Sequence, residues 1–82
     1  MSTVTAGQKF RAAIKANQPL QIVGTINAYT AMMAERTGHK ALYLSGAGVA
    51  NASFGLPDLG MTSLNDVCED IRRITAATSL PL

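Results

Sequence analysis

The sequence has one cysteine, one histidine and no long apolar run. Because Cys68 has no second thiol to pair with, no disulfide can form within the chain, and a cytoplasmic location is predicted. No apolar stretch approaches the roughly 20 residues that a membrane helix requires. The first residues also lack the basic segment and apolar core of a secretory signal. We therefore expect no membrane partner.

Charge of either sign is sparse and dispersed. Seven Lys and Arg residues against five Asp and Glu residues give a net charge of +2. The basic residues form no run that would indicate a nucleic-acid or membrane-binding patch. A hydrophobic content of 48% with 15% charged residues is typical of a folded globular chain. The composition therefore predicts a globular chain with no nucleic-acid partner.

The two residues most often used for metal or thiol chemistry are predicted to be structural. His39 has no cysteine, aspartate or second histidine close by in the sequence, so a surface position is favoured over metal ligation. Cys68 lies within a helical apolar pattern, which favours core packing over a nucleophilic role.

Alternating helical and strand patterns predict parallel β/α units. The predicted elements are, in order, a helix at 5–17, a strand at 20–24, a helix at 27–37, a strand at 41–45, a helix at 62–77 and a strand beginning at 80–82. The spacing of about 20 residues between strands fits a (β/α)8 TIM-type barrel, an α/β fold that takes roughly 250 residues. We therefore expect residues 1–82 to be the N-terminal portion of a single barrel domain.

Short polar residues mark the predicted helix starts, and apolar spacing marks the buried faces. The predicted N-caps are Thr5, Asn27 and Ser63. The apolar stripe of the last helix comprises Leu64, Val67, Cys68, Ile71 and Ile74. Its charged residues, assigned to a solvated face, are Asp66, Glu69, Asp70, Arg72 and Arg73. Met32 and Met33 are interpreted as core-filling side chains.

The stretch from Tyr43 to Gly60 is the part of the chain most suited to a ligand. It begins in an apolar strand pattern and continues with small residues, one hydroxyl at Ser45 and one carboxylate at Asp58. In α/β proteins, ligands bind at the loops that follow the carboxyl ends of strands. The glycines also come close to a dinucleotide fingerprint, but that motif requires a helix to begin within it. Because Ser53, Gly55, Pro57 and Gly60 follow, we predict a wide loop here.

Two motifs in this stretch, YLSG and the later GLPDLG, closely resemble the isocitrate lyase and phosphoenolpyruvate mutase superfamily. The resemblance extends over residues 21–75, and the segment DIRRIT at 70–75 narrows it toward the methylisocitrate lyase family. Where the family has SGG after the second barrel strand, this chain has Ser45, Gly46 and Ala47.

The resemblance implies a carbon–carbon lyase that cleaves 2-methylisocitrate to pyruvate and succinate in the methylcitrate cycle of propionate catabolism. It implies Mg²⁺ as the cofactor, a tricarboxylate as the substrate and a homotetramer as the assembly. Ser45, Gly46 and Ala47 would face a substrate carboxylate, and Tyr43 would line the same pocket. Asp58 would approach the water bound to the metal. Thr25 and Asn27, after the first strand, are weaker candidates.

The resemblance also implies what these residues would not supply. The metal ligands and the general-acid cysteine of the family are expected beyond Leu82, and nothing around Cys68 matches the loop of that cysteine. The 82 residues alone are therefore expected to be inactive. Two alternatives remain open at this point. One is another superfamily enzyme, such as an isocitrate lyase, a phosphonomutase or an oxaloacetate hydrolase, and the other is a non-catalytic assembly module.

Overall fold

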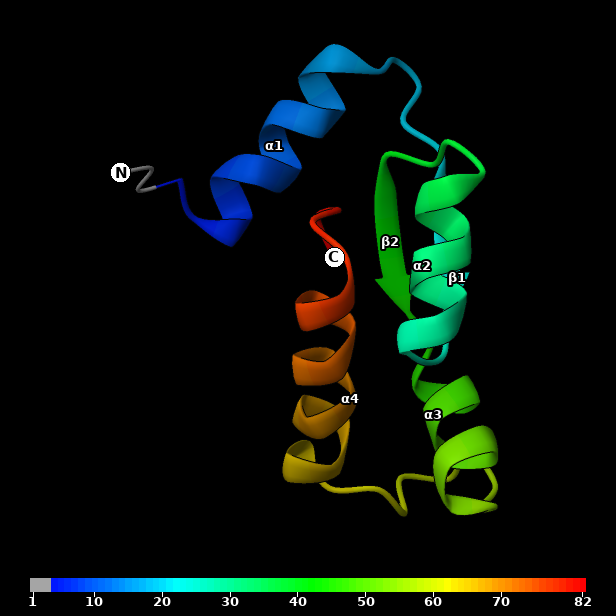
Figure 1. Ribbon diagram of the computed structural model, residues 1–82. Helices are drawn as coiled ribbons and strands as arrows, with labels where there is room; N and C mark the ends of the chain where they lie inside the picture. Colours follow the sequence, from blue (N-terminus) through cyan, green and yellow to red (C-terminus); the bar gives the residue numbers. More distant parts are fainter. Residues whose placement is uncertain (1–3) are drawn as a thin grey trace.

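The computed structural model describes residues 4–82, which form four helices and two strands (Figure 1). The elements are α1 (Ala6–Ala16), β1 (Ile22–Thr25), α2 (Ala28–Arg36), β2 (Ala41–Leu44), α3 (Gly46–Phe54) and α4 (Leu64–Ala77). The predicted helices at 5–17, 27–37 and 62–77 and the strands at 20–24 and 41–45 are all present, with ends shifted by at most two residues. Over the part of the chain described, no helix combines the length and the apolar character needed to cross a membrane.

Each of the three predicted N-caps begins its helix through a side chain. Thr5, Asn27 and Ser63 all accept a hydrogen bond from the backbone N–H three residues ahead. In each case the side chain at that third position bonds back to the backbone of the cap, which completes a capping box. These capping boxes can be predicted from the sequence because both partners lie within one helical turn.

β1 and β2 form a parallel two-stranded sheet, as predicted, with Val23 opposite Leu42. Leu42 belongs to the central cluster of buried apolar residues, together with Ala31 and Ala34 of α2 and Ile74 of α4. Since side chains alternate across a strand, Leu42 faces the helices and Tyr43 faces the opposite side. The helices α2 and α4 therefore cover one face of the sheet and leave the other face open.

No strand is formed at 80–82 in the described part of the chain, but the segment lies where the predicted strand would pair. The N–H of Leu42 donates to the carbonyl of Pro81 at 2.8 Å, so this segment lies at the edge of β2. The Thr78 hydroxyl donates to the Glu35 carboxylate of α2, which ties the end of α4 to its neighbour. A single hydrogen bond to β2 is too little to define a strand.

The predicted wide loop after β2 is wrong, because residues 46–54 form α3. Ser45 is its N-cap, and Gly55 ends it in the left-handed conformation at φ 65°, the common role of glycine at a helix end. The helix-breaking residues Pro57 and Gly60 lie beyond this stop. They therefore delimit α3 and do not prevent it.

Several predicted core residues are exposed. Met32 and Met33 are 48% and 43% exposed, and Leu64 at the start of the α4 stripe is 78% exposed. In α2 the buried positions are the small residues Ala31 and Ala34, which allow α4 to approach closely. Helix α1 is amphipathic but buries none of its residues, and it lies to one side of the β/α units (Figure 1).

Candidate active site

The predicted site residues gather where the two strands end. β1 ends at Thr25 and β2 at Leu44, and the parallel pairing brings both carboxyl ends to one edge of the sheet. The next residue, Ser45, donates its backbone N–H to the carbonyl of Thr25 at 3.0 Å. Helix α3 begins there, so its N-terminus is fixed at the edge where α/β proteins bind ligands.

Ser45 has a hydroxyl hydrogen available for a ligand. Its Oγ accepts the backbone N–H of Gly48 at 3.0 Å and so caps α3. Within residues 4–82 the Ser45 hydroxyl donates to no acceptor. A serine in this state can hold the helix end through its lone pair and bond a carboxylate oxygen through its hydrogen at the same time.

The backbone N–H groups of Gly46 and Ala47 are the remaining donors at this helix end. The first N–H groups of a helix have no intrahelical partner. In α3 the cap satisfies Gly48, and the N–H of Val49 donates to the Ser45 carbonyl. The two amides between them remain, beside the positive end of the helix dipole, which favours anions.

Ala47 takes a regular helical conformation although the related family has glycine there. No non-glycine residue of the described chain has a positive φ, so Ala47 stores no backbone strain. Its side chain is half-buried, whereas Gly46 is exposed. The first turn of α3 therefore accepts an alanine without distorting the two amides.

Close packing requires a glycine at position 48, a requirement that the sequence did not indicate. A Cβ built on Gly48 would lie 2.1 Å from Cγ2 of Ile26, and 3.2 Å from both Cβ of Ile26 and Oγ of Ser45. The first turn of α3 thus packs directly on the segment that follows β1. This close approach sets the position of Ser45 relative to the end of the neighbouring strand.

Tyr43 lies on the open face of the sheet. It is 64% exposed and, by the alternation of β2, points away from α2 and α4. In a closed barrel this face is the inner one, where a side chain near the strand's carboxyl end borders the ligand site.

Within residues 4–82, no hydrogen bond joins Asp58 to these residues. It is exposed in the loop after α3, in a turn closed by the backbone bond from Leu59 to Pro57 at 2.9 Å. Within the described chain, no hydrogen bond or ion pair holds its carboxylate. Its approach to the site stays a prediction.

The two weaker candidates have internal roles. Thr25 is 1% exposed and its hydroxyl reaches the carbonyl of Tyr43 at 3.5 Å. The amide oxygen of Asn27 caps α2 by accepting the N–H of Thr30 at 2.9 Å. Both side chains form hydrogen bonds within the protein and so position the loop after β1.

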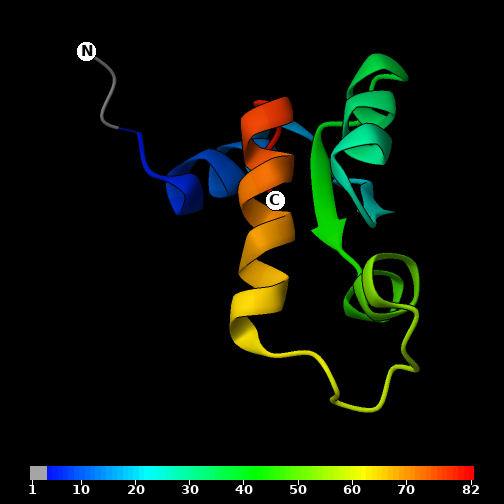
Figure 2. The same cartoon turned by 60° about the horizontal axis from the view of Figure 1, so that its bottom comes forward.

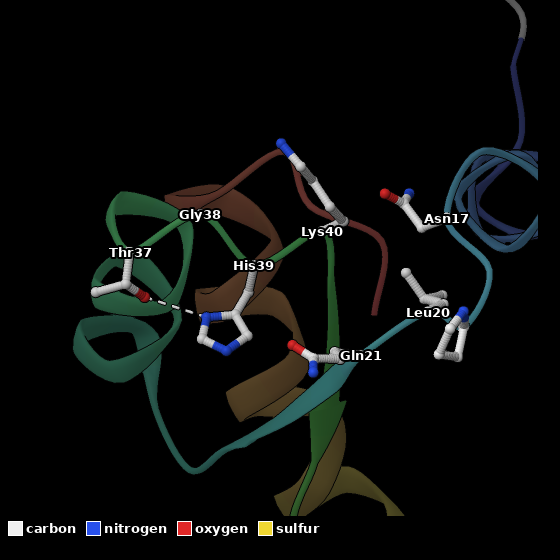
Figure 3. Close-up of a pocket in the computed structure, with 8 residues that line it drawn as sticks. Asn17, Leu20, Gln21, Thr37, Gly38, His39 and Lys40 are labelled. Carbon is white, nitrogen blue, oxygen red and sulfur yellow. Dashed lines mark hydrogen bonds between the residues drawn. The ribbon is translucent and has the colours of Figure 1, made fainter.

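A hollow of about 470 Å³ lies at the opposite edge, before the strands begin. Figure 3 shows its lining, which includes Asn17, Gln21, His39 and Lys40. His39 is half-buried, with Nδ1 3.1 Å from the hydroxyl of Thr37, so the predicted surface position is only partly correct. Helices α1 and α2 end beside this hollow, and helix C-termini disfavour anions. The hollow therefore suits a carboxylate substrate less well than the N-terminus of α3.

The residues from 4 to 82 do not by themselves form a metal site. Between residues 4 and 82, no three His, Cys, Asp or Glu side chains come together in a way that could hold a metal ion. Asp58 is the one carboxylate in the predicted site. A Mg²⁺ site usually combines several ligands from the protein and the substrate, so Asp58 alone is too few. The Mg²⁺ requirement implied by the resemblance therefore remains a prediction.

Relatives of known name match almost the whole chain. It is 70% identical over 80 residues to a 2-methylisocitrate lyase of Shewanella oneidensis, a match that covers 98% of this chain and 27% of the relative. It is 60% identical over 82 residues to a 2-methylisocitrate lyase of Escherichia coli, covering 100% of this chain and 28% of the relative. The chain thus spans little more than a quarter of the length of the relatives it matches.

A solved structure confirms the predicted fold class. The crystal structure of 2,3-dimethylmalate lyase, a member of the PEP mutase/isocitrate lyase superfamily, superposes with a TM-score of 0.75 at 32% identity. The match covers 90% of this chain and 26% of that one, so the two β/α units correspond to the first part of a (β/α)8 barrel. A sequence model of the family described as phosphoenolpyruvate phosphomutase matches residues 10–82. The chain therefore belongs to the phosphoenolpyruvate phosphomutase family.

Proposed function

We propose that this chain supplies the carboxylate-binding edge of a lyase that cleaves 2-methylisocitrate to pyruvate and succinate. The observation that carries the proposal is the N-terminus of α3, where the Ser45 hydroxyl and the Gly46 and Ala47 amides have no acceptor among residues 4–82. These donors follow β2 at the carboxyl edge of the sheet. The 70% identity to a 2-methylisocitrate lyase supports the choice of substrate.

The reaction needs an anchored substrate before any bond breaks. A base removes the hydroxyl proton of 2-methylisocitrate, its oxygen becomes the carbonyl of pyruvate, and the carbon–carbon bond breaks. The electron pair passes to the departing succinate enolate, which an acid protonates on carbon. Hydroxyl and amide donors bind a substrate carboxylate without adding a charge of their own. The role of Ser45, Gly46 and Ala47 in this scheme is to bind and orient.

Three further properties complete the proposal as predictions. Mg²⁺ would stabilise the developing enolate, the assembly would be a homotetramer, and the location would be the cytoplasm. The alternative is cleavage of a related 2-hydroxy acid, since the chain also resembles 2,3-dimethylmalate lyase in structure. Ala47 stands where the family has glycine, and this departure favours testing the alternative.

The activity is best tested with the rest of a barrel present. In a chimera, these 82 residues replace the matching segment of the Shewanella lyase, which is 70% identical. We expect this barrel chimera to form pyruvate from 2-methylisocitrate within about tenfold of the parent rate, and to lose that activity in EDTA. The isolated chain, as the control, should form none. A folded but inactive chimera would reject the proposal, and faster turnover of 2,3-dimethylmalate would favour the alternative.

Asp58→Asn in the barrel chimera should lower kcat about tenfold or more without changing the unfolding temperature, in line with losses at groups that support a metal site. The backbone, and not the carboxylate, closes the turn around Asp58, so the fold should not depend on the charge. Steady-state kinetics and thermal unfolding check this expectation. Glu69→Gln, which removes an exposed carboxylate from α4, is the matched control. Normal turnover and metal affinity in Asp58→Asn would leave Asp58 without a role in the reaction.

A further inference from the structure

Asp70 is a buried carboxylate, although its sequence context predicts a solvated one. It lies on α4, is only 4% exposed, and accepts the Ser53 hydroxyl on Oδ2 at 3.0 Å. Its other oxygen lies 3.6 Å from Nη1 of Arg73, a side chain that is 61% exposed. The prediction of a solvated face is therefore wrong for Asp70. A carboxylate so deeply buried requires partners, and Ser53 is the one that belongs to another element.

The Ser53 bond is the polar connection between α3 and α4. No other side-chain hydrogen bond or ion pair joins these two helices among residues 4–82. Helix α3 buries only two of its nine residues, Val49 and Ala50, so apolar packing holds it weakly. The loop that joins the two helices bows out below them before it reaches the start of α4 (Figure 2). The far end of α3 therefore depends on Asp70 for its position.

The near end of α3 carries the proposed carboxylate donors. Ser45 caps the helix and Ser53 lies in its last turn, eight residues or about 12 Å further along the axis. The first turn is held by the contact between Gly48 and Ile26 and by the Ser45 N–H bond to the Thr25 carbonyl. Because both contacts lie near one end, the helix can still tilt about them, and a fixed point at the other end sets its direction.

We propose that Asp70 is a positioning residue for substrate binding. Through Ser53 it fixes the end of α3, and so aims the amides of Gly46 and Ala47 and the hydroxyl of Ser45 at the substrate carboxylate. The proposal rests on the function proposed above. Asp70 touches neither the substrate nor the reacting atoms in this scheme. It acts by setting the direction of α3. Misplacement of the substrate donors by about 1 Å can lower the rate roughly a hundredfold.

The attachment of α4 does not depend on this carboxylate. Ile74, one turn further along the same face, is fully buried in the central cluster with residues of α2 and β2. Removing the Asp70 carboxylate should therefore loosen α3 and leave α4 in place. This difference separates a positioning role from a general contribution to stability.

The test compares five variants of the barrel chimera. Asp70→Ala and Ser53→Ala should each raise KM and lower kcat/KM about ten- to a hundredfold. The double variant should lose no more than either single one, because both changes remove the same bond. Asp70→Asn keeps an acceptor for Ser53 and should restore most of the activity. Glu69→Gln, which alters an exposed ion pair on the same helix, should behave like the parent. Additive losses, or equal losses in Asp70→Asn and Asp70→Ala, would overturn the proposal.

Hydrogen exchange measures the same effect without reference to activity. In Asp70→Ala and Ser53→Ala, amides in the segment 46–55 should exchange faster, while those in 64–77 should keep their protection. Ser53 is exposed, so its alanine variant provides the test even where Asp70→Ala fails to fold. Unchanged exchange in 46–55 would refute the positioning role. An inactive parent chimera with this exchange pattern would instead reject the proposed function alone.

Discussion

Gly48→Ala should lower the unfolding temperature of the barrel chimera by several degrees and remove most of its activity. A β-carbon at this position would lie 2.1 Å from Cγ2 of Ile26, whereas carbon atoms in contact prefer about 3.5–4 Å. Replacing glycine by alanine within a helix normally stabilises by about 1 kcal/mol. Overpacking typically costs about 1–3 kcal/mol and sometimes more. The clash outweighs the gain because its closest partner is a methyl group next to the backbone, not the end of a flexible chain.

The displacement also moves the proposed substrate donors. Relief of the clash requires the first turn of α3 and the segment after β1 to separate, and Ser45 and the amides of Gly46 and Ala47 move with that turn. We expect kcat/KM for 2-methylisocitrate to fall about a hundredfold, as for a shift of roughly 1 Å. Thermal unfolding and steady-state kinetics of the same samples check both effects.

Gly46→Ala is the matched control for stability. It places the same methyl group in the same helical turn, but nothing lies within 4 Å of the added carbon. Its unfolding temperature should equal or exceed that of the parent. Ile26→Ala combined with Gly48→Ala should recover part of the loss, because it removes the methyl that meets the new side chain. A Gly48→Ala variant as stable as Gly46→Ala would contradict the predicted clash.

Features that depend on neighbours in sequence could be predicted from the sequence. The capping box of Ser63 with Asp66 joins residues of a single turn, so residue types alone reveal it. The parallel pairing followed from the alternation of strands and helices. Helix α3 was missed because most of its residues are small and its few polar side chains mark no distinct face, so it lacks the periodicity by which amphipathic helices are found. The signal that could have revealed it was Ser45 as a cap with Gly55 as the stop.

Burial of a charged residue could not be predicted in the same way. Asp70 and Glu69 are adjacent and chemically alike, yet Asp70 is buried against Ser53 while Glu69 remains about half exposed. The difference arises from where α3 lies, and α3 was the element that the sequence interpretation missed. The exposure of Met32 and Met33 has a similar origin, because the small residues of α2 form its contact with α4. Burial is set by partners distant in sequence.

Within the candidate site, the sequence located the donors but not their geometry. Ser45, Gly46 and Ala47 were identified as carboxylate ligands from a resemblance, and were interpreted as parts of a wide loop. Their place in the first turn of α3 gives the two amides a common direction and adds the helix dipole. Whether Asp58 joins them remains a prediction, since within residues 4–82 no backbone hydrogen bond links the turn that carries it to the first residues of α3.

Ser45→Ala in the barrel chimera should lower kcat/KM for 2-methylisocitrate about 10- to 150-fold. Loss of one hydrogen bond to a charged group costs about 1.5–3 kcal/mol, which converts to that range. Most of the loss should appear in KM if the contact is equally strong in the ground and transition states. The same substitution removes the cap that holds the Gly48 N–H. Stability should therefore fall by about 0.5–2 kcal/mol as well, and the two effects must be separated.

Ser63→Ala separates them, because Ser63 caps α4 through the same type of bond, accepted from the Asp66 N–H at 3.2 Å. It should lose a similar amount of stability while kcat/KM stays at the parent value, since α4 offers nothing to the substrate in the proposed scheme. Ser45→Thr, which keeps both the cap acceptor and the hydroxyl hydrogen, should restore binding. If Ser45→Ala and Ser63→Ala lost activity equally, the Ser45 hydroxyl would act only as a helix cap. A loss confined to Ser45→Ala would place its hydrogen on the substrate carboxylate, because the cap bond uses only the lone pair of that oxygen.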